Sequence, residues 1–511
     1  MKPFRSFASA AALALVLFGP AAHADVTAAE VWGDWRDYMQ GMGYKITADE
    51  AASGGQLIVN DIRINAGMGD DAGTMTLSLG SMTFTENGDG SVNIIMPDMM
   101  PMTVDIVSPD VQHPVSLAFN YTQSGQNMVA SGTLENLTYD YSADSFGLAL
   151  VELKADGKVY GEGNAKIMVS VADIVSTTVT SGGDLRDYQQ SITTGPVSYE
   201  FFVKPPEEPN SARIKGQTAG VSFAGQSTIP RGLVDASDVK ALLDSGFAFD
   251  GNFEFGAGAT AIVVEDPANG GGTIDAKAGG GNFSAKMDNT GIIYAGDKQS
   301  IEMNATFASF PFPITASIAS NGFRMQMPLA KSDTPQDFAM AFNLTEFEMS
   351  DILWGLFDPS GQLPRDPATL VLDMSGKAKL LFDLLDQKAA EQMAAAGAQP
   401  AEIDALKINS LVLDAVGAKL TGTGDVTFDN TDKVTFPGIP KPIGAINLSL
   451  LGGNGLLDKL VAMGFVPEDQ AMGARMMMGL FAVPGDTPDT LNSTIEFTNE
   501  GQVLANGQRI K

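Results

Sequence analysis

The sequence contains no cysteine among its 511 residues. Disulfides, iron–sulfur clusters, thiolate zinc sites and cysteine nucleophiles are therefore excluded. Histidine is nearly absent too, since only His23 and His113 occur. A serine triad in the body of the chain would need His113 as its base, and no G-x-S-x-G motif accompanies it. We interpret His113, which precedes Pro114, as a turn residue.

Positive charge is scarce. The chain has 31 Lys and Arg against 61 Asp and Glu, a formal net charge of −30. Binding to nucleic acid or to an anionic membrane surface needs basic patches, so this balance argues against both. It favours a soluble protein that self-repulsion keeps from associating. Beyond the N-terminus, no apolar run reaches the ~18 residues of a membrane span, so we expect no stable transmembrane anchor.

The N-terminal residues have the pattern of a secretory signal. Lys2 and Arg5 supply positive charge, residues 8–18 form a short apolar run, and Gly19-Pro20 ends it. Ala22-His23-Ala24 is a small-x-small cleavage pattern. These features predict a signal peptide over residues 1–24, cleaved between Ala24 and Asp25, and a periplasmic mature protein. No cysteine follows, so a lipoprotein anchor is excluded.

Most of the chain beyond residue 44 has a hydrophobic period of two, which is typical of strands with one buried face. Turn sequences such as Asn87-Gly88 and Asp156-Gly157 separate these runs at about ten-residue spacing. This predicts a mainly β fold with minor α structure: extended antiparallel sheets, meandering, curved or stacked, with an N-terminal helix and a few helical insertions. The clearest alternating runs lie at 115–121, 137–141, 197–203, 247–255, 338–344 and 446–450.

Thr27 and Glu30 form a capping box before an aromatic helix that ends at Gly41 or Gly43. Its acidic neighbours, including Asp34, and its lack of a lysine-rich face favour packing on the protein's own sheet over docking on a membrane. Later helices are expected at 236–245, 379–396, 456–463 and 468–481, with a further turn at 399–406. Loops are expected at 204–209, which is proline-rich, and at 269–281, which is glycine-rich.

The length predicts more than one domain or one very extended domain. We divide the chain into a signal peptide (1–24), an N-terminal helix with a β-rich domain (25–205), and a β-rich domain with helical insertions (206–511). The boundary falls near 205–235. The alternative is one continuous β structure.

Residues 353–370 carry a resemblance to a known family. Trp354-Gly355-Leu356-Phe357-Asp358-Pro359 and then Leu363-Pro364-Arg365-Asp366-Pro367 resemble a signature of the domain of unknown function 2125 family, exported proteins of alphaproteobacteria. The ending from Phe497 to Gly507 is similar to that family's C-terminus. The resemblance implies no activity and transfers no catalytic residues. The strand pattern also loosely resembles AsmA-type envelope proteins, long β-structures thought to hold lipid.

Motifs for chemistry are weak. Ser237-Asp238-Val239-Lys240 matches S-x-x-K, but the accompanying K-T-G motif of penicillin-binding proteins is absent, so a helix start explains it better. Residues 269–275 fail the calcium-binding glycine repeat at Thr273. Glycosidases need two carboxylates, and no pair stands out among the 61 acids. We therefore predict no catalytic, cofactor or metal residues and no cofactor.

The apolar strand faces must be covered by another sheet, by helices or by a ligand. Methionine suits surfaces that accept varied apolar partners, although core filling is its commoner role. This favours a non-enzymatic periplasmic protein that binds lipid or another hydrophobic ligand, or that assists envelope assembly. The alternatives are a structural or protein-interaction module and a carboxylate-dependent envelope hydrolase. The tentative ligand or lid residues are Met472, Met476, Met477, Met478, Met99 and Met100.

Overall fold

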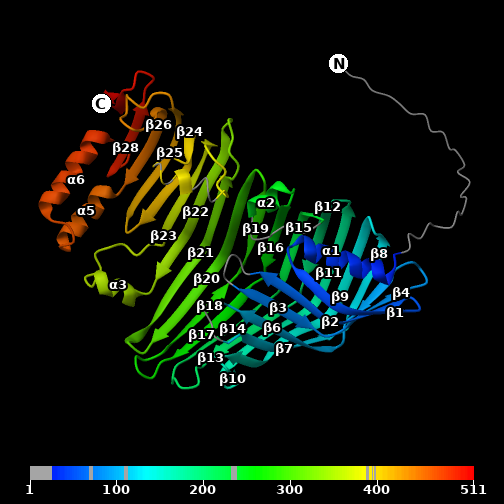
Figure 1. Ribbon diagram of the computed structural model, residues 1–511. Helices are drawn as coiled ribbons and strands as arrows, with labels where there is room; N and C mark the ends of the chain where they lie inside the picture. Colours follow the sequence, from blue (N-terminus) through cyan, green and yellow to red (C-terminus); the bar gives the residue numbers. More distant parts are fainter. Residues whose placement is uncertain are drawn as a thin grey trace, which may run out of the picture.

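The computed structural model describes residues 26–67, 73–108, 113–231, 239–386 and 391–511, apart from 394, 396 and 398 (Figure 1). The predicted signal peptide and Ser237 lie outside these residues. In the described ranges no helix combines the length and the apolar character that crossing a bilayer requires. The helices are α1 (Ala28–Gly41), α2 (Val239–Asp244), α3 (Asp351–Phe357), α5 (Gly453–Ala462) and α6 (Glu468–Phe481).

The strands belong to one antiparallel sheet, which confirms the predicted fold class. The N-terminal strands are β1 (Lys45–Ser53), β2 (Gln56–Gly67), β3 (Thr74–Leu79), β4 (Met82–Glu86), β5 (Val92–Ile95), β6 (Met99–Val107), β7 (Val115–Ser124), β8 (Asn127–Thr133), β9 (Asn136–Ala155), β10 (Lys158–Tyr160), β11 (Ala165–Gly182), β12 (Leu185–Thr193), β13 (Val197–Val203), β14 (Ser211–Thr218) and β15 (Val221–Pro230).

The remaining strands are β16 (Ala248–Phe255), β17 (Gly258–Glu265), β18 (Gly272–Ala278), β19 (Gly280–Asp288), β20 (Gly291–Phe307), β21 (Phe310–Pro328), β22 (Gln336–Met349), β23 (Ala368–Leu380), β24 (Ala401–Ala415), β25 (Ala418–Asp429), β26 (Lys441–Leu451), β27 (Val483–Pro484), β28 (Thr490–Phe497), β29 (Val503–Ala505) and β30 (Gln508–Arg509). The six alternating runs singled out above fall on these strands, apart from Phe247, which directly precedes β16.

The chain crosses the sheet as a meander in which pairs of short strands lie between long ones. β12 and β13 both pair with β11, and β18 and β19 both pair with β20. From β20 to β26 each strand pairs with the next, and β28 follows β26. Figure 1 shows the result as one long, strongly curved sheet that leads from the N-terminal helix to the C-terminal helices.

The breaks between short strands line up across the sheet. At the first break the backbone N–H of Gly195 donates to the carbonyl oxygen of Ala172. At the next two breaks the N–H of Ala219 donates to the carbonyl of Ala257, and the N–H of Gly279 donates to the carbonyl of Gln299. In the long strands at the same line, Asp173 and Ser300 both have φ of 50°. Such irregularities bend a strand and increase its local twist. We attribute the curvature of the sheet to this row of aligned strand breaks and irregular residues.

The larger of the two clusters of buried hydrophobic residues lies under α1. The predicted capping box is present at Thr27 and Glu30. Val31 and Trp32 are almost completely buried against a strand cluster that includes Phe84. Trp35 meets the edge of the Phe84 ring, with centroids 5.6 Å apart. The prediction that this helix packs on the protein's own sheet is therefore confirmed.

Three local predictions are wrong. Of the helix expected at 379–396, residues 379–380 lie in β23, 381–386 are not helical and 391–393 are helical. Residues 401–406 of the expected turn lie in β24. The Ala- and Leu-rich sequence favours helix, but pairing with β23 and β25 overrides this preference. The glycine-rich loop at 269–281 contains β18. A Cβ on Gly272 would lie 2.6 Å from the Phe307 ring, so close packing of strand on ring explains the glycine. The predicted helices at 456–463 and 468–481 are confirmed as α5 and α6, and the described part of 236–245 as α2.

The predicted domain boundary near 205–235 falls inside the sheet. β13 pairs with β14 over Val197–Val203, and β12 pairs with β15 along Leu185–Thr193. Residues 204–210 form the loop between β13 and β14, as predicted for the proline-rich stretch.

Candidate functional site

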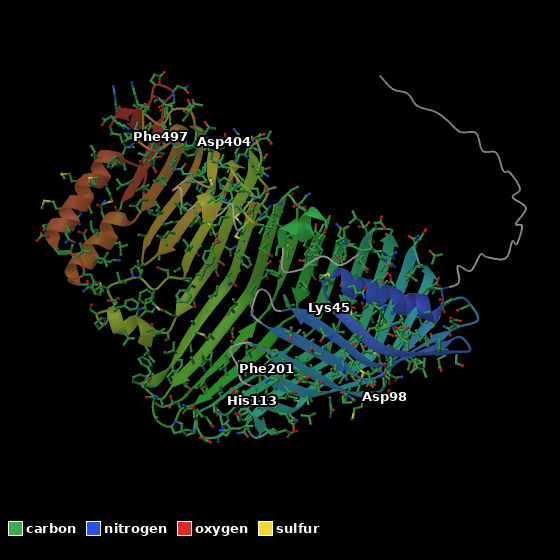
Figure 2. The ribbon with its side chains drawn as sticks, viewed as in Figure 1. Lys45, Asp98, His113, Phe201, Asp404 and Phe497 are labelled. Carbon is green, nitrogen blue, oxygen red and sulfur yellow. The ribbon has the colours of Figure 1, made fainter. Side chains whose placement is uncertain are left out.

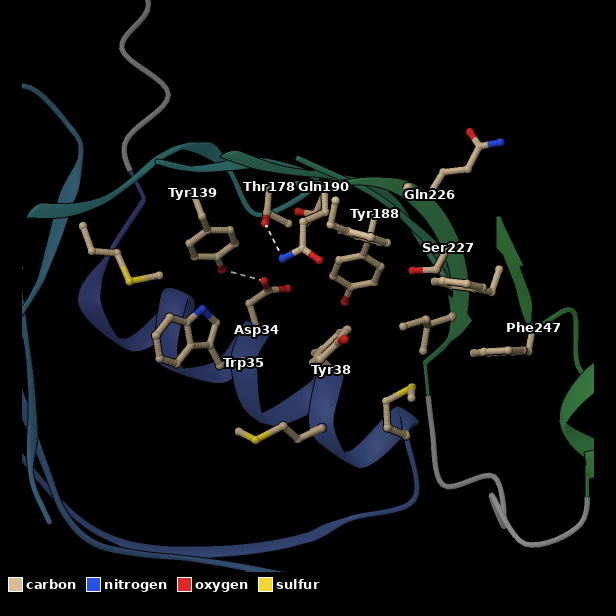
Figure 3. A pocket seen from close by; sticks show the side chains of 18 residues that line it. Asp34, Trp35, Tyr38, Tyr139, Thr178, Tyr188, Gln190, Gln226, Ser227 and Phe247 are labelled. Carbon is tan, nitrogen blue, oxygen red and sulfur yellow. Dashed lines mark hydrogen bonds between the residues drawn. The ribbon is translucent and has the colours of Figure 1, made fainter. Parts of the chain in front are cut away.

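A pocket of about 450 Å³ lies between α1 and the strands that it faces (Figure 3). Its walls are mostly apolar and aromatic, with a few hydrogen-bonding groups, as in most small-molecule sites. α1 supplies one wall and β9, β11, β12 and β15 supply the other. The lining residues are Asp34, Trp35, Tyr38, Met39, Met42, Met128, Tyr139, Thr178, Thr180, Tyr188, Gln190, Phe223, Gly225, Gln226, Ser227, Ile229, Phe247 and Phe249.

The α1 wall follows from helical geometry. Asp34 and Tyr38 are four residues apart and therefore lie on one face of the helix, and Met42, four residues further, is its C-cap residue. Figure 3 shows Asp34, Trp35 and Tyr38 pointing from α1 toward the strands. The Tyr38 ring meets the edge of the Tyr188 ring, with centroids 4.8 Å apart.

A buried ion pair joins the helix to the sheet at one side of the pocket. Asp34 pairs with Arg186 of β12, and both side chains are at most 2% exposed. The Tyr139 hydroxyl donates to Asp34 Oδ2 at 2.6 Å, and Arg186 Nη2 donates to Thr180 Oγ1 at 2.6 Å. Arg231, which is partly exposed, lies 4.0 Å from Asp34 Oδ1. The pair holds α1 at a fixed position over β9, β11 and β12.

Burial dominates the electrostatics of this cluster. It raises the pKa of Asp34 above its ordinary value, while the Tyr139 hydrogen bond and the two guanidiniums oppose the rise. Burial and the nearby Asp34 carboxylate raise the pKa of Tyr139, and the same two causes raise the pKa of Tyr188. Both hydroxyls are therefore neutral at physiological pH and can donate hydrogen bonds. Among the described residues, Asp34 is the only carboxylate that lines the pocket, so its described lining does not contain the two convergent acids that a hydrolase needs.

Two adjacent rows of side chains lead away from this pocket across the sheet, and we call them together the apolar strip. Each row is a chain of direct cross-strand partners from β15 onward. The first row is Gly225, Gly251, Ala285, Tyr294, Met325, Met340, Met374, Ile408, Gly424, Ile446 and Ile495. The second row is Phe223, Phe253, Phe283, Gly296, Phe323, Phe342, Leu372, Leu411, Gly422 and Leu448.

The strip is continuous with the pocket. On the pocket side of Gly225, the first row continues through its partner Gln190 and then Thr178 to Tyr139. Aromatic contacts follow the second row. Phe223 lies 4.6 Å from Phe253, and Phe283 lies 6.4 Å from Phe323, between ring centroids. An apolar ligand therefore meets an unbroken surface from the pocket onto the later strands.

Much of the strip is accessible to solvent. Phe323 is 47% exposed and Met340 is 49% exposed, values that are high for large apolar side chains. The opposite face of the same strands is polar: Arg324, Ala341 and Asp373 are successive cross-strand partners there. Among the described residues, the sheet at β21–β23 thus has one mainly apolar face and one mainly polar face, and the strip residues Met325, Met340 and Met374 belong to neither cluster of buried core residues.

The methionines proposed from the sequence as ligand or lid residues do not come together. Met99 and Met100 lie at the start of β6, where Met99 is exposed and Met100 is buried. Met472, Met476 and Met477 are exposed on α6, at the other end of the sheet, and Met478 is half-buried. Met472, Met476 and Met477 therefore do not fill the core, which is the commoner role for methionine. None of the six lines the pocket under α1.

Sequence reasoning missed the pocket and the ion pair. One clue was available, because Asp34 shares a helix face with Val31, Trp35 and Tyr38. An acid on an apolar face implies a buried partner. Nothing in the sequence identified Arg186 as that partner, since the contact depends on sheet register.

The residues that carried the family resemblance form a structural loop. Asp358, completely buried, accepts hydrogen bonds from the backbone N–H of Gln362 (2.9 Å) and Leu363 (2.8 Å). Arg365 lies over the Trp354 ring at 6.0 Å and pairs with Asp351. These contacts shape the turn after α3. His113 lies in the loop before β7, at the lower rim of the sheet in Figure 2, far from this turn.

Residues 249–510 match a family described as uncharacterized proteins conserved in bacteria (DUF2125). The match begins within β16 and includes α3, α5, α6 and nearly the whole apolar strip, whereas α1 precedes it. No curated protein matches the chain. The comparisons do not show the likeness to AsmA-type proteins, which stays a prediction.

Proposed function

The chain belongs to the DUF2125 family of bacterial proteins, and we propose that it is an exported, non-enzymatic protein that binds the acyl chains of lipids along the apolar strip. The single observation that carries this proposal is the strip itself: two rows of residues that are apolar or glycine apart from Tyr294, with exposed members on β21 and β22. The exposed members there are Phe323, Met325, Met340 and Phe342. The pocket under α1 closes one end of the strip and receives one end of the ligand.

The chemistry of the strip favours an acyl chain over a peptide. Tyr294 is its only member with a polar side chain, and the strand backbone beneath is already hydrogen-bonded between neighbours. A peptide laid on this surface would lose water from its own N–H and C=O groups without gaining partners, which is costly. A hydrocarbon chain has no such groups and gains from leaving water.

The length of the strip also fits lipid. The first row crosses β15, β16, β19, β20, β21, β22, β23, β24, β25, β26 and β28. At about 4.8 Å between neighbouring strands, these ten spacings amount to about 48 Å. The hydrocarbon core of a bilayer is ~30 Å thick for two opposed chains. The strip is therefore longer than two acyl chains laid end to end.

The test is native mass spectrometry with organic extraction on mature protein purified gently from a periplasmic fraction. We expect bound phospholipid or fatty acid that is lost on denaturation. Met340→Asp places a charge on the strip and should lower lipid occupancy at least severalfold. Ala341→Asp is the matched control, because it adds the same charge on the opposite face, between Arg324 and Asp373.

A wild-type protein that stays free of lipid, even after incubation with envelope lipids, would overturn the proposal. Equal losses of lipid in the two variants would place the lipid elsewhere than on the strip.

A further inference from the structure

We infer that the edge formed by α3, α5 and α6 docks on the surface of a zwitterionic lipid bilayer. This inference rests on the proposed function and extends it to the source of the lipid. The short helices of this edge expose several large apolar side chains. The residues are Leu356 (65% exposed) and Phe357 on α3, Phe465 between α5 and α6, and Met472 (65%), Met476 (72%), Met477 and Leu480 on α6.

The three helices project from the same edge of the sheet. α3 follows β22, and α5 follows β26. In an antiparallel meander every second strand runs in the same direction, so β22 and β26 end at one edge. Figure 1 shows α3, α5 and α6 together at the C-terminal end of the molecule, and Figure 2 shows their side chains projecting outward.

The positions on α6 define a helix face. Met472, Met476 and Leu480 are successive residues at a spacing of four, so they lie on one side of the helix. They point away from the sheet, because the buried residue of α6 is Ala471. A row of exposed apolar residues on one side is the pattern of a helix that lies in a membrane interface.

The charge around this face points to zwitterionic lipid. The two arginines of the edge are each paired, Arg475 with Asp458 and Arg365 with Asp351. Lys459 is a further cation on α5, but the described residues show no cluster of cations beside the apolar side chains, and the whole chain has a net charge of −30. An anionic surface would repel such a protein. Docking must therefore depend on apolar insertion, and added salt should not release the protein.

The edge is also next to the apolar strip. α5 begins at Gly453, directly after β26, and a Cβ on Gly453 would lie 2.5 Å from Leu450 Cδ2. Leu450 and its partner Leu420 lie beside the strip residues Leu448 and Gly422. A lipid is nearly insoluble as a monomer, so a protein that binds it must meet a bilayer. At this edge of the sheet the strip lies next to helices that expose apolar side chains.

The experiment is flotation of the full mature chain with phosphatidylcholine vesicles. We expect the wild type to float with the vesicles at both low and high salt. The triple variant Met472→Gln, Met476→Gln and Leu480→Gln should lose at least tenfold in partitioning. The control pair is Val434→Gln and Ile439→Gln, which removes two exposed apolar residues (87% and 58%) from the opposite sheet edge and should float normally.

Several outcomes would overturn the inference: a wild type that does not float, a triple variant that still floats, or a control that loses flotation equally. If the wild type instead self-associates in sedimentation and the triple variant is monomeric, the edge is a contact between copies. Lipid content measured on the same samples separates this inference from the proposed function. Bound lipid without flotation would contradict the inference of membrane docking and leave the proposed lipid binding intact. Flotation of a protein that never carries lipid would contradict the proposed lipid binding along the strip.

Discussion

Replacing Arg186 by methionine tests how α1 is held on the sheet. The substitution roughly keeps the side-chain length and removes the guanidinium that contacts Asp34. Asp34 then remains almost completely buried, with only Arg231 at 4.0 Å as a nearby cation. Breaking one side of a buried ion pair costs about 3–5 kcal/mol of unfolding free energy. We expect a loss in this range at neutral pH.

The loss should depend on pH with a definite sign. Burial already raises the pKa of Asp34, so the native state takes up a proton more readily than the unfolded chain. The stability that Asp34 contributes is therefore full below its ordinary pKa and falls as pH rises through the native pKa. Without Arg186 the native pKa rises further. The deficit of the variant should consequently shrink at acid pH and grow toward neutrality.

The measurement is urea unfolding followed by tryptophan fluorescence at two pH values. Two of the three tryptophans, Trp32 and Trp35, lie on α1 and report directly on its docking. The double variant Arg186→Met with Asp34→Leu removes both charges and should recover most of the lost stability, because apolar replacement of a buried pair is often neutral. A loss below about 1 kcal/mol, a deficit that ignores pH, or a double variant no better than the single one would refute the reasoning.

Three further results are expected. Tyr139→Phe removes the hydroxyl that donates to Asp34 and should cost about 1.5–3 kcal/mol in the same urea assay, the usual range for a hydrogen bond to a charged group. Gly376→Val should lower the free energy of unfolding by about 1–3 kcal/mol, because a Cβ there would lie 2.5 Å from the Phe338 ring. Thermal or urea unfolding measures this loss. In native mass spectrometry, a strip about 48 Å long should carry more than one lipid per chain at saturation, and a fixed ratio of one would contradict that length.

The general architecture could be predicted from the sequence because apolar and polar residues alternate within each strand, and this pattern does not depend on the neighbouring strands. Val197 to Val203 and Phe338 to Leu344 both read as strands with one apolar side, and both are. The N-terminal helix could also be predicted, because its capping box joins two residues that are close in sequence. Residues 401–415 were not, because their composition favours helix and only pairing with neighbours on both sides makes them a strand.

The candidate site could not be predicted from the sequence, for a different reason. The apolar strip exists only through register: Phe283 meets Gly296, and Gly296 meets Phe323, across three strands. A slip of one residue in any pair would send the apolar side chains to the opposite face. Alternation within single strands therefore predicts that apolar faces exist, and it cannot predict that those of β15 to β28 align into one surface.

The charge of the chain explains how such a surface can remain open. A sheet that exposes Phe323 and Met340 would be expected to pack against a second copy of itself. Acids outnumber basic residues by 61 to 31, and acids such as Asp373 and Asp425 lie on the polar face of the same strands. The resulting repulsion between copies opposes association, yet it does not act on an uncharged hydrocarbon chain. Under the proposed function, the net charge therefore opposes contact between two copies of the chain at the strip and leaves the binding of an uncharged lipid chain unaffected.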